Sequence, residues 1–492
     1  MFLSSVIIMV FILVCYWLLT KRPMDFPPGP KFLPIVGNIN ILKHIKILKF
    51  HHLLWHNLSK LYGPVVGLKF FHKYVVIVSS KEAIKEVYTR DELNGRPDGF
   101  FFRIRTFEKR LGVVFTDGHF WENQRRFSAT TLKHLGVGKF GMVKHIEHEA
   151  EELVSELMRK SEVCDVFPMH SAFDVSVLNL MWVLLKGERF ELDDQKLIDL
   201  VAAVHKNFQV LDMSGGILNL FPAIRYLMPE QCGYKELVDT MKPIWSFLAD
   251  EIEIIKENYD PALEPKCFIE AYIKEMSKLH DQDNFFSDEQ LFGICIDFFQ
   301  AGSETTANSL GFAILYMLHY PKVMRRVQVE IMSIVGANKL PKLNDRPKLK
   351  YTDAVISEVQ RCANIAPLGI AHRAVKNAHL NGFLIPKDAT ILCNLYSLNM
   401  DDKNWKKPAE FMPERFLNDD GDLIFPDYFI PFAMGKRRCL GENVAKSSLF
   451  LFFASIVHSF DIKCVGELPD LLGIDGISLA PKPFKVKLWR RF

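Results

Sequence analysis

The feature that most constrains the fold is the longest helix pattern in the chain, residues 287–319. Ser287 and Gln290 have the spacing of a capping box, two acidic residues in the first turn suit the helix dipole, and Pro321 ends the pattern. At the standard rise per residue, such a helix spans about 48 Å. Its middle, CIDFFQAGSETTANSLGF, is apolar on nearly all sides, which predicts burial through the core.

The rest of the chain can supply the core that this helix needs. Hydrophobic residues make up 49% of the 492 residues, enough for one large packed body. Most apolar spacing between residues 81 and 318 is helical, whereas strand patterns occur near residues 62–80, 379–396 and 477–489. Without internal repeats or long linkers, we expect a mainly α fold with a small β part, forming a single domain over residues 39–492.

The N-terminus has the pattern of a membrane anchor. Residues 2–20 carry no charge and are followed by Lys21 and Arg22. An apolar run of this length can cross a bilayer, and basic residues on its C-terminal side keep that side in the cytosol. We therefore predict an uncleaved transmembrane anchor over residues 1–22, a proline-rich hinge over residues 23–38, and the remaining bulk in the cytosol.

Charge and cysteine usage exclude several classes of protein. A net charge of +3 is too small to predict nucleic-acid binding. The nine cysteines are odd in number, scattered, and contain no C-x-x-C pair, which argues against a zinc cluster and a disulfide framework. We expect reduced cysteines in a reducing compartment.

One cysteine stands out because of its neighbours. The segment FAMGKRRCLG, residues 432–441, places Cys439 directly after three basic residues and between glycines. Positive charge favours the thiolate, the form that binds metals and attacks electrophiles. The segment alone leaves two interpretations open: a thiolate ligand or nucleophile, or a surface loop with a chance cysteine.

A short polar stretch interrupts the long apolar helix at AGSETT, residues 301–306. Glycine beside Ser and Thr weakens helix hydrogen bonding, and hydroxyls can bond back to freed carbonyls, so we expect a local widening that admits a small ligand or water. The Glu304 carboxylate beside the Thr305 hydroxyl could relay protons. The alternative is a polar stripe that faces solvent.

Two further helical pairs could act together with these residues. Glu358 and Arg361 have i, i+3 spacing and can pair, and Arg415 in PERF could join them in a buried network. Trp121 and Arg125 have i, i+4 spacing, so one helix face offers an indole N–H and a guanidinium. This pair suits an anionic ligand, although exposed Trp–Arg stacking would give the same pattern.

Taken in order, these motifs resemble the cytochrome P-450 superfamily of haem-thiolate monooxygenases. FAMGKRRCLG matches the haem loop F-x-x-G-x-R-x-C-x-G, AGSETT the oxygen-activating helix, EVQR with PERF the structural triad, and WENQR the W-x-x-x-R helix. The anchor and the PPGP hinge match the microsomal branch. The resemblance runs from about residue 27 to the C-terminus and implies the cytochrome P-450 fold, with the long central helix lying over haem b.

The resemblance also assigns roles to residues. Cys439 would be the axial thiolate on the haem iron, and the propionates would be held by Arg437, Trp121, Arg125 and His372. Phe432 would shield the thiolate, while Gly435 and Gly441 would let the backbone approach and donate N–H bonds to it. Thr305 and Glu304 would deliver the protons that oxygen activation needs. The structural triad would be Glu358, Arg361 and Arg415.

The substrate pocket is carried over by position in the fold. Its wall would come from residues 103–115, 294–301, 366–370 and 474–479, including Ile294, Asp297, Phe298, Ala301, Leu368 and Ile370. Residues 213–229 would form a roof that dips into the membrane. Gln300 departs from the family pattern, which often has Gly there, and would narrow or polarise the pocket.

The resemblance finally implies partners and an activity. Electrons would come from NADPH through NADPH–cytochrome P-450 reductase in the endoplasmic reticulum membrane, and one oxygen atom of O2 would enter a lipophilic substrate. The chain is most similar to insect members of the clan that contains the drug-metabolising enzymes, so we expect epoxidation of methyl farnesoate to juvenile hormone. A broad hydroxylase of xenobiotics, steroids or other terpenoids is the alternative, and a non-catalytic haem sensor or carrier is the third.

Overall fold

The structure is a computed structural model that describes residues 20–138, 140–210, 216–278 and 285–492. Its α-helices are α2 (Lys43–Leu48), α3 (His51–Tyr62), α4 (Lys81–Thr89), α5 (Phe100–Ile104), α6 (Gly118–His134), α7 (Phe140–Val163), α8 (Asp174–Lys186), α9 (Gln195–Val210), α10 (Gly216–Leu220), α11 (Ile224–Leu227), α12 (Tyr234–Glu257), α13 (Phe268–Lys278), α14 (Asp288–His319), α15 (Pro321–Val335), α16 (Lys350–Ala363), α17 (Leu395–Asn399) and α18 (Glu442–Ser459). The strands are β1 (Val65–Phe70), β2 (Lys73–Val78), β3 (Phe167–Pro168), β4 (His372–Arg373), β5 (Ala378–Leu380), β6 (Phe383–Ile385), β7 (Thr390–Cys393), β8 (Phe460–Val465) and β9 (Lys485–Arg490).

The long helix α14 lies where the sequence predicts it. Ser287 is its N-cap and accepts a hydrogen bond from the backbone N–H of Gln290 at 3.2 Å, and Pro321 follows its last residue. The other half of the predicted capping box is absent, because the Gln290 side chain instead bonds both backbone groups of Gly112. The helix is continuous from end to end, so the widening expected at residues 301–306 does not interrupt it.

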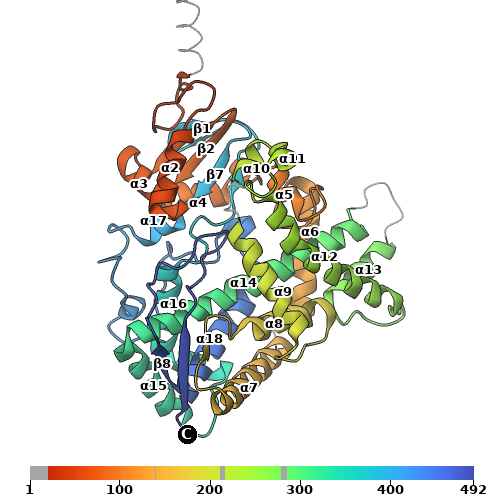
Figure 1. The fold of residues 1–492 in the computed structure, drawn as a ribbon, viewed down its shortest axis with the longest axis vertical. Coiled ribbons are helices and arrows are strands. Elements are labelled where there is room, and N and C mark those ends of the chain that lie inside the picture. The colour runs from red at the N-terminus through yellow and green to blue at the C-terminus, as the bar shows by residue number, and fades with distance from the viewer. Residues whose placement is uncertain (1–19, 139, 211–215, 279–284) are drawn as a thin grey trace, which may run out of the picture.

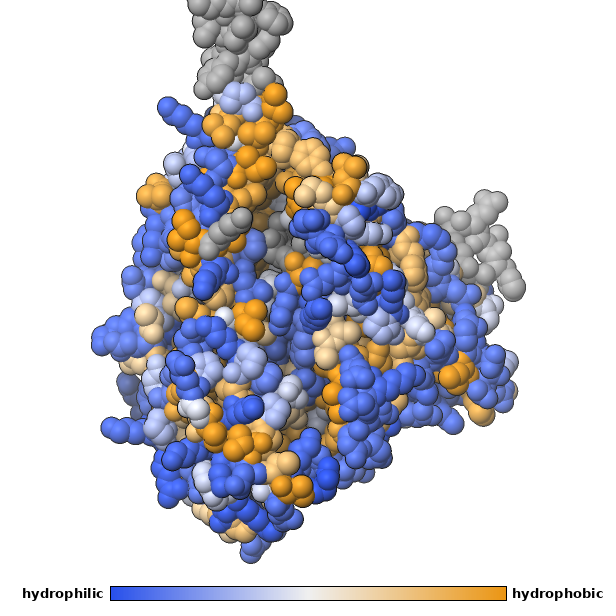
Figure 2. All heavy atoms as spheres, in the orientation of Figure 1, coloured by the Kyte–Doolittle hydropathy of each residue, from blue (hydrophilic) through white to orange (hydrophobic). Residues whose placement is uncertain are grey.

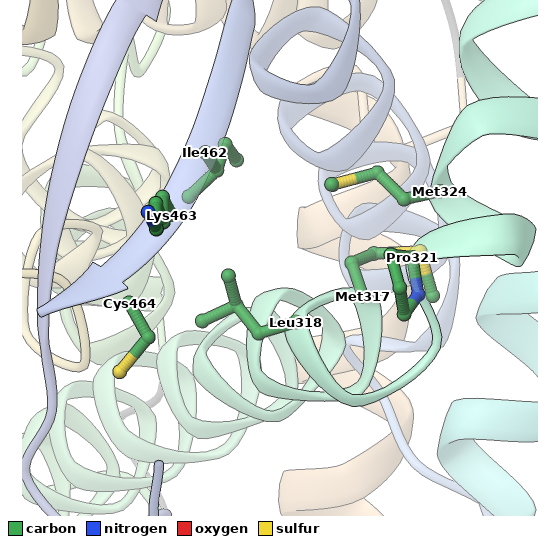
Figure 3. A pocket seen from close by; sticks show the side chains of 7 residues that line it. All are labelled: Met317, Leu318, Pro321, Met324, Ile462, Lys463 and Cys464. Atoms are coloured by element: carbon green, nitrogen blue, oxygen red, sulfur yellow. The ribbon is translucent and has the colours of Figure 1, made fainter. Parts of the chain in front are cut away.

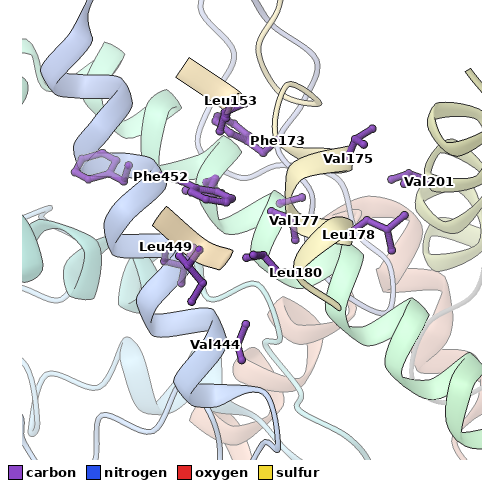
Figure 4. Close-up of a cluster of buried hydrophobic side chains, with 14 of the residues drawn as sticks. Leu153, Phe173, Val175, Val177, Leu178, Leu180, Val201, Val444, Leu449 and Phe452 are labelled. Carbon is purple, nitrogen blue, oxygen red and sulfur yellow. The ribbon is translucent and has the colours of Figure 1, made fainter. Parts of the chain in front are cut away.

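The core surrounds α14. In Figure 1 this helix crosses the middle of the helical body, with α8, α9 and α12 on one side and α16 and α18 on the other. The neighbouring helix α8 is apolar on most sides, and its side chains meet those of α18 in the cluster drawn in Figure 4. Phe452 of α18 points into this cluster and is fully buried. The prediction of a mainly helical body around a buried central helix is therefore confirmed.

The small β part forms three sheets. The largest has the strand order β1-β2-β7-β4, in which β1 and β2 form the predicted antiparallel hairpin and Val75 of β2 pairs in parallel with Thr390 of β7. A second sheet has the order β3-β9-β8, and a third is the hairpin β5-β6. Both larger sheets thus join segments that lie far apart in the chain.

The predicted anchor over residues 1–22 falls almost wholly on residues 1–19, which lie outside the described residues. Among the residues that the structure does describe, no helix is both long and apolar enough to span a bilayer. The hinge that follows packs on the domain, where the backbone N–H of Gly67 on β1 donates to the carbonyl of Pro28 at 2.8 Å.

The cap of the central helix gives a direct test of its contribution. We expect Ser287→Ala to lower the free energy of unfolding by about 1 kcal/mol, because the Gln290 N–H loses its acceptor. Ser333→Ala, on an exposed turn inside α15, is the matched control and should change it by no more than a few tenths of a kcal/mol, towards higher stability. Urea unfolding of both variants measures the difference, and equal effects would contradict the capping role.

Candidate functional site

Cys439 lies on a tight loop just before α18. A single 3-10 turn over Gly435–Arg437 precedes it, and the Cys439 N–H donates to the carbonyl of Phe432 at 3.0 Å, which closes the loop. Gly435 has a φ of +65°, and a Cβ there would lie 2.3 Å from the carbonyl oxygen of Tyr88. Glycine is therefore required at this position both by conformation and by space.

The thiol of Cys439 faces an enclosed space. Its side chain is accessible to solvent, yet burial raises its pKa, so the surface it exposes is surrounded by protein. Backbone N–H groups of Gly441 and Glu442 at the start of α18, together with the charge of Arg125, act in the opposite direction and lower the pKa of Cys439. Burial outweighs these effects, so the pKa of Cys439 stays above its ordinary value.

The three basic residues next to Cys439 are engaged elsewhere: Lys436 and Arg438 lie at the surface, and Arg437 lies against Trp121. Lys436 pairs with Asp91 at 2.7 Å, and Arg438 pairs with Glu442. Arg437 turns away from the sulfur and stacks on the Trp121 ring at 3.5 Å from its centroid. Sequence proximity to the thiol was misleading, because in a tight loop successive side chains point in different directions.

The middle of α14 also has accessible surface. Ala301 is exposed and Thr305 partly exposed, although both lie in a helix that is otherwise packed in the core. Both Thr305 and Ser303 bond back to the carbonyl four residues earlier, as the polar stretch predicts, at 2.9 and 2.8 Å. Gly302 allows α8 to approach, since a Cβ there would lie 2.1 Å from Cγ of Met181. The alternative of a polar stripe facing outer solvent is excluded, because Ser303, Glu304 and Thr306 are buried.

Glu304 is held within the protein. Its side chain is 1% exposed, and its carboxylate pairs with Nδ1 of His205 on α9. The amide of Asn308 donates to its other oxygen at 2.7 Å. Glu304 therefore has almost no solvent-exposed surface of its own, and its partner His205 is more exposed, at 22%.

A group of buried donors lacks acceptors. Nε1 of Trp121, Nη1 of Arg437 and Nε2 of His372 are buried and have no hydrogen-bond partner among the described residues. Burial and the neighbouring Arg96 lower the pKa of Arg437 to about 8, and burial with Arg96 and Arg437 lowers the pKa of His372 well below its ordinary value. Unpaired buried donors and clustered positive charge are unfavourable unless an anionic group is present.

This donor set fits the propionates of haem, with a thiol available for iron and unsatisfied N–H groups for carboxylates. Arg96 belongs to the same cluster: it is buried, and its Nη1 donates to the carbonyl of Ala371 at 3.0 Å. Sequence analysis missed Arg96, because nothing in its local pattern distinguishes it and its neighbours come from distant segments.

The expected charged network is present. Nε and Nη2 of Arg361 each donate to Glu358 at 2.8 Å, and Nε of Arg415 donates to the same carboxylate at 2.9 Å. Glu358 and Arg361 have no exposed side-chain surface, and Trp405 covers both arginines. Because α16 carries two of these residues and the Pro413–Phe416 turn the third, the network fixes this turn on α16.

The residues predicted for the pocket wall separate into two groups. Ala301 is exposed on α14, and Leu368 and Ile370 pack in an apolar cluster with Phe115 and Ile477. The other three are packed in protein in this structure, for reasons visible in their contacts: Ile294 is fully buried, Phe298 packs on Phe268, and Asp297 forms a buried ion pair with Arg105 at 2.5 Å.

Asp297 and Gln300 both serve to connect elements. Asp297 also accepts the N–H groups of Val113 and Val114, at 2.6 and 2.9 Å, and so holds the segment before α6 on α14. The Gln300 amide contacts Sδ of Met241 and Oδ1 of Asn207, at 3.2 and 3.4 Å. The side chain of Gln300 therefore points to α12 and α9, and its polar group is engaged there.

A separate surface groove lies at the far end of α14, lined by Met317, Leu318, Pro321, Met324, Ile462, Lys463 and Cys464 (Figure 3). Met317 is twelve residues beyond Thr305, which corresponds to roughly 18 Å along the helix axis. This groove is therefore distinct from the space beside Cys439.

The buried network offers a test of its structural role. We expect Glu358→Gln to lower the free energy of unfolding by about 3–5 kcal/mol, because two buried arginines lose their counter-charge. Glu414→Gln is the matched control: its carboxylate is half exposed and pairs with a half-exposed Arg326, so the loss should stay below about 1 kcal/mol. Urea unfolding followed by tryptophan fluorescence compares the two, and a small effect of Glu358→Gln would refute this account.

Comparison with known proteins agrees with this arrangement. The Cytochrome P450 family model matches residues 27–488. The chain is 37% identical over 486 residues to farnesoate epoxidase of Bombyx mori, covering 98% of this chain and 97% of that protein. It is 36% identical to the probable cytochrome P450 305a1 of Drosophila melanogaster (96% and 95% covered) and 36% identical to cytochrome P450 2J3 of Rattus norvegicus (92% and 89% covered). The chain therefore belongs to the cytochrome P450 family and is a cytochrome P450 monooxygenase.

Proposed function

We propose that haem b binds in the enclosed space between α14 and the 432–441 loop, with Cys439 as the axial thiolate. The observation that carries this proposal is a thiol that is accessible yet surrounded by protein, together with buried donors on Trp121, Arg437 and His372 that lack acceptors among the described residues. Those donors, on Arg437, Trp121 and His372, would hold the propionates, and Arg125 and Arg96 would add positive charge. Bound haem supplies the activation of O2.

We further propose that Thr305 and Glu304 handle protons in this site. The Thr305 hydroxyl lies on the accessible face of α14 and is oriented by its bond to the carbonyl of Ala301. Glu304, the residue before it, has a carboxylate with partners on α9 and within α14. Thr305 would hold a water or oxygen species by hydrogen bonding, and Glu304 would supply the proton.

The substrate that these features favour is a lipophilic terpenoid ester, methyl farnesoate, which would be epoxidised to juvenile hormone. Support comes from the farnesoate epoxidase relative and from the apolar cluster around Leu368, Ile370 and Phe115. An acyclic terpenoid presents few polar groups, so an apolar wall can bind it by burial alone.

We propose that substrate enters from the membrane of the endoplasmic reticulum. Apolar side chains are exposed at one end of the molecule, where the N-terminal segment and α10 with α11 lie (Figures 1 and 2). Leu227 and Tyr226 are 81% and 75% exposed, and Met24 and Ile35 on the N-terminal segment are 81% and 68% exposed. Together with an anchor over residues 1–22 and a hinge over residues 23–38, this face would rest on the bilayer, with the single domain 39–492 in the cytosol.

On the Cys439 side, Lys436 and Arg438 are more than half exposed. They would help to attract NADPH–cytochrome P-450 reductase, which would supply the electrons from NADPH.

An optical titration of the purified oxidised protein with methyl farnesoate tests the proposal. We expect a saturable blue shift of the haem band at low ligand concentration, because an ester bound over the iron displaces its water. A normal thiolate–haem spectrum without a shift would retain the monooxygenase but reject this substrate in favour of other terpenoids, steroids or xenobiotics.

Two cysteine variants control this titration. Cys439→Ser should abolish the thiolate–haem spectrum, whereas Cys464→Ser, at the distant groove, should retain it. A thiolate spectrum that survives Cys439→Ser would overturn the haem assignment.

A hydroxyl deletion tests the role of Thr305. In Thr305→Ala we expect product formed per NADPH to fall roughly 10-fold or more, because positioned proton transfer contributes about 10²–10⁴-fold and water replaces only part of it. Ser155→Ala on α7 removes a hydroxyl with the same bond to a preceding carbonyl, at 2.9 Å on an exposed face, and should leave the ratio unchanged. Unchanged coupling in Thr305→Ala would reject this role.

A further inference from the structure

The carboxylate of Glu304 is connected to a second carboxylate through a histidine. His205 on α9 contacts Glu304 through Nδ1, and its Nε2 lies 2.9 Å from Oδ2 of Asp174 at the start of α8. The three side chains form one line from α8 across α9 to α14. None of these contacts could be inferred from spacing, since the residues come from three separate helices.

An imidazole between two carboxylates can donate to both of them in only one protonation state. A neutral imidazole donates from one nitrogen only, whereas ionised carboxylates accept and cannot donate. Both contacts are satisfied when the ring is protonated, and the two carboxylates raise the pKa of His205 to about 10 against the opposing effect of burial. At neutral pH the ring therefore stores a proton beside Glu304.

Among the described residues near this line, Ser478 is a neutral donor whose hydroxyl lies 3.4 Å from Oε1 of Glu304, and burial raises the pKa of Asp174. His170, which precedes α8, faces Asp174, and burial lowers its pKa, so it is neutral there. On α12, which packs against α9, Glu236 pairs with Lys206 at 3.2 Å, away from this line.

Of the three side chains, solvent reaches His205 best. Its side chain is 22% exposed, compared with 12% for Asp174 and 1% for Glu304. Ala202 and Gln209, one turn before and after it on the same face of α9, are exposed. Glu304 in turn adjoins Thr305, which faces the enclosed space. His205 thus lies between the protein surface and the site.

Resting on the monooxygenase chemistry proposed above, we propose that His205 supplies the protons that Glu304 passes into the site, while Asp174 holds the ring in place. As the site draws a proton through Glu304, the Nδ1–H bond of His205 breaks and an Oε2–H bond forms on the Glu304 carboxylate, which then passes that proton on. The electron pair stays on Nδ1, and the neutral ring keeps its Nε2 proton on Asp174. Solvent at the exposed edge then returns a proton to the ring. His205 acts only through Glu304, so we class it as a positioning residue and not as a catalytic one.

A first experiment is independent of turnover. The purified protein, labelled with ¹⁵N-histidine and held in its diamagnetic ferrous carbon monoxide form, gives ring nitrogen signals by NMR, and His205→Gln identifies those of His205. We expect both ring nitrogens to be protonated at pH 8 and to titrate only towards about pH 10. A neutral His205 ring at pH 8 would overturn the proposal.

A second experiment separates proton supply from structural support. His205→Gln keeps a hydrogen-bonding side chain but cannot carry the proton, and His205→Arg keeps the positive charge but releases no proton below about pH 12. Product per NADPH from methyl farnesoate should fall roughly 10-fold in both variants, with the loss growing as pH rises from 7 to 9. His379→Gln, an exposed histidine on β5, is the matched control and should behave as wild type.

The outcomes are distinguishable. A wild-type yield of product per NADPH in His205→Arg would mean that the positive charge alone suffices. A wild-type yield in both variants would mean that His205 is not used. Either result rejects the relay. A wild-type protein that binds haem but forms no product would reject the proposed function instead, and the NMR result would still decide the protonation state. Retention of the thiolate spectrum shows that a variant is folded. Where a variant does not fold, the NMR titration of the wild-type protein decides whether His205 is protonated at pH 8, as the proposal requires.

Discussion

The structure depends on burying a long, mostly apolar helix that carries a few polar side chains in its middle. In α14, Gln300, Glu304 and Asn308 lie in the core. The free energy lost by burying an unpaired polar group there exceeds the free energy gained by burying an apolar one. Each therefore needs a partner, and the partners of the first two lie on other helices: Asn207 and Met241 contact Gln300, and His205 contacts Glu304. These contacts specify how α9 and α12 lie on α14. Packing of apolar side chains alone would allow these helices to slide.

Around Cys439, by contrast, several buried polar groups of the described chain have no partner. Among the described residues there, buried donors on Trp121, Arg437 and His372 lack acceptors. The neighbouring Arg110 and Arg373 share Asp117, and Arg373 also pairs with Asp388. Such an arrangement stores unfavourable electrostatic energy until an anion arrives. The family implies a haem cofactor, and its two carboxylates would supply the acceptors that these donors lack, so that loading of haem would stabilise the fold.

Prediction from the sequence succeeded where the signal is local. The limits of α14, the β1–β2 hairpin and the Glu358–Arg361 pair follow from a cap, a turn and an i, i+3 spacing. It failed where direction is set by tertiary packing. The basic side chains beside Cys439 point to Asp91, Trp121 and Glu442, and Asp297 serves a loop; no period in the sequence encodes those directions. Arg96 and His205 were missed for the same reason, because their partners lie far away along the chain.

The strand pairing has a consequence for the order in which the molecule assembles. Val75 pairs with Thr390, and Phe167 pairs with Val486, so one larger sheet cannot close until about four fifths of the chain has been made, and the other until almost all of it has. Closing such long loops delays folding, and the β2 strand carries an unpaired edge in the meantime. The helical body between these strands, with its local contacts, can form first. During synthesis the nascent chain therefore passes through a stage in which early strands wait for late partners, and this is when it most needs protection from aggregation.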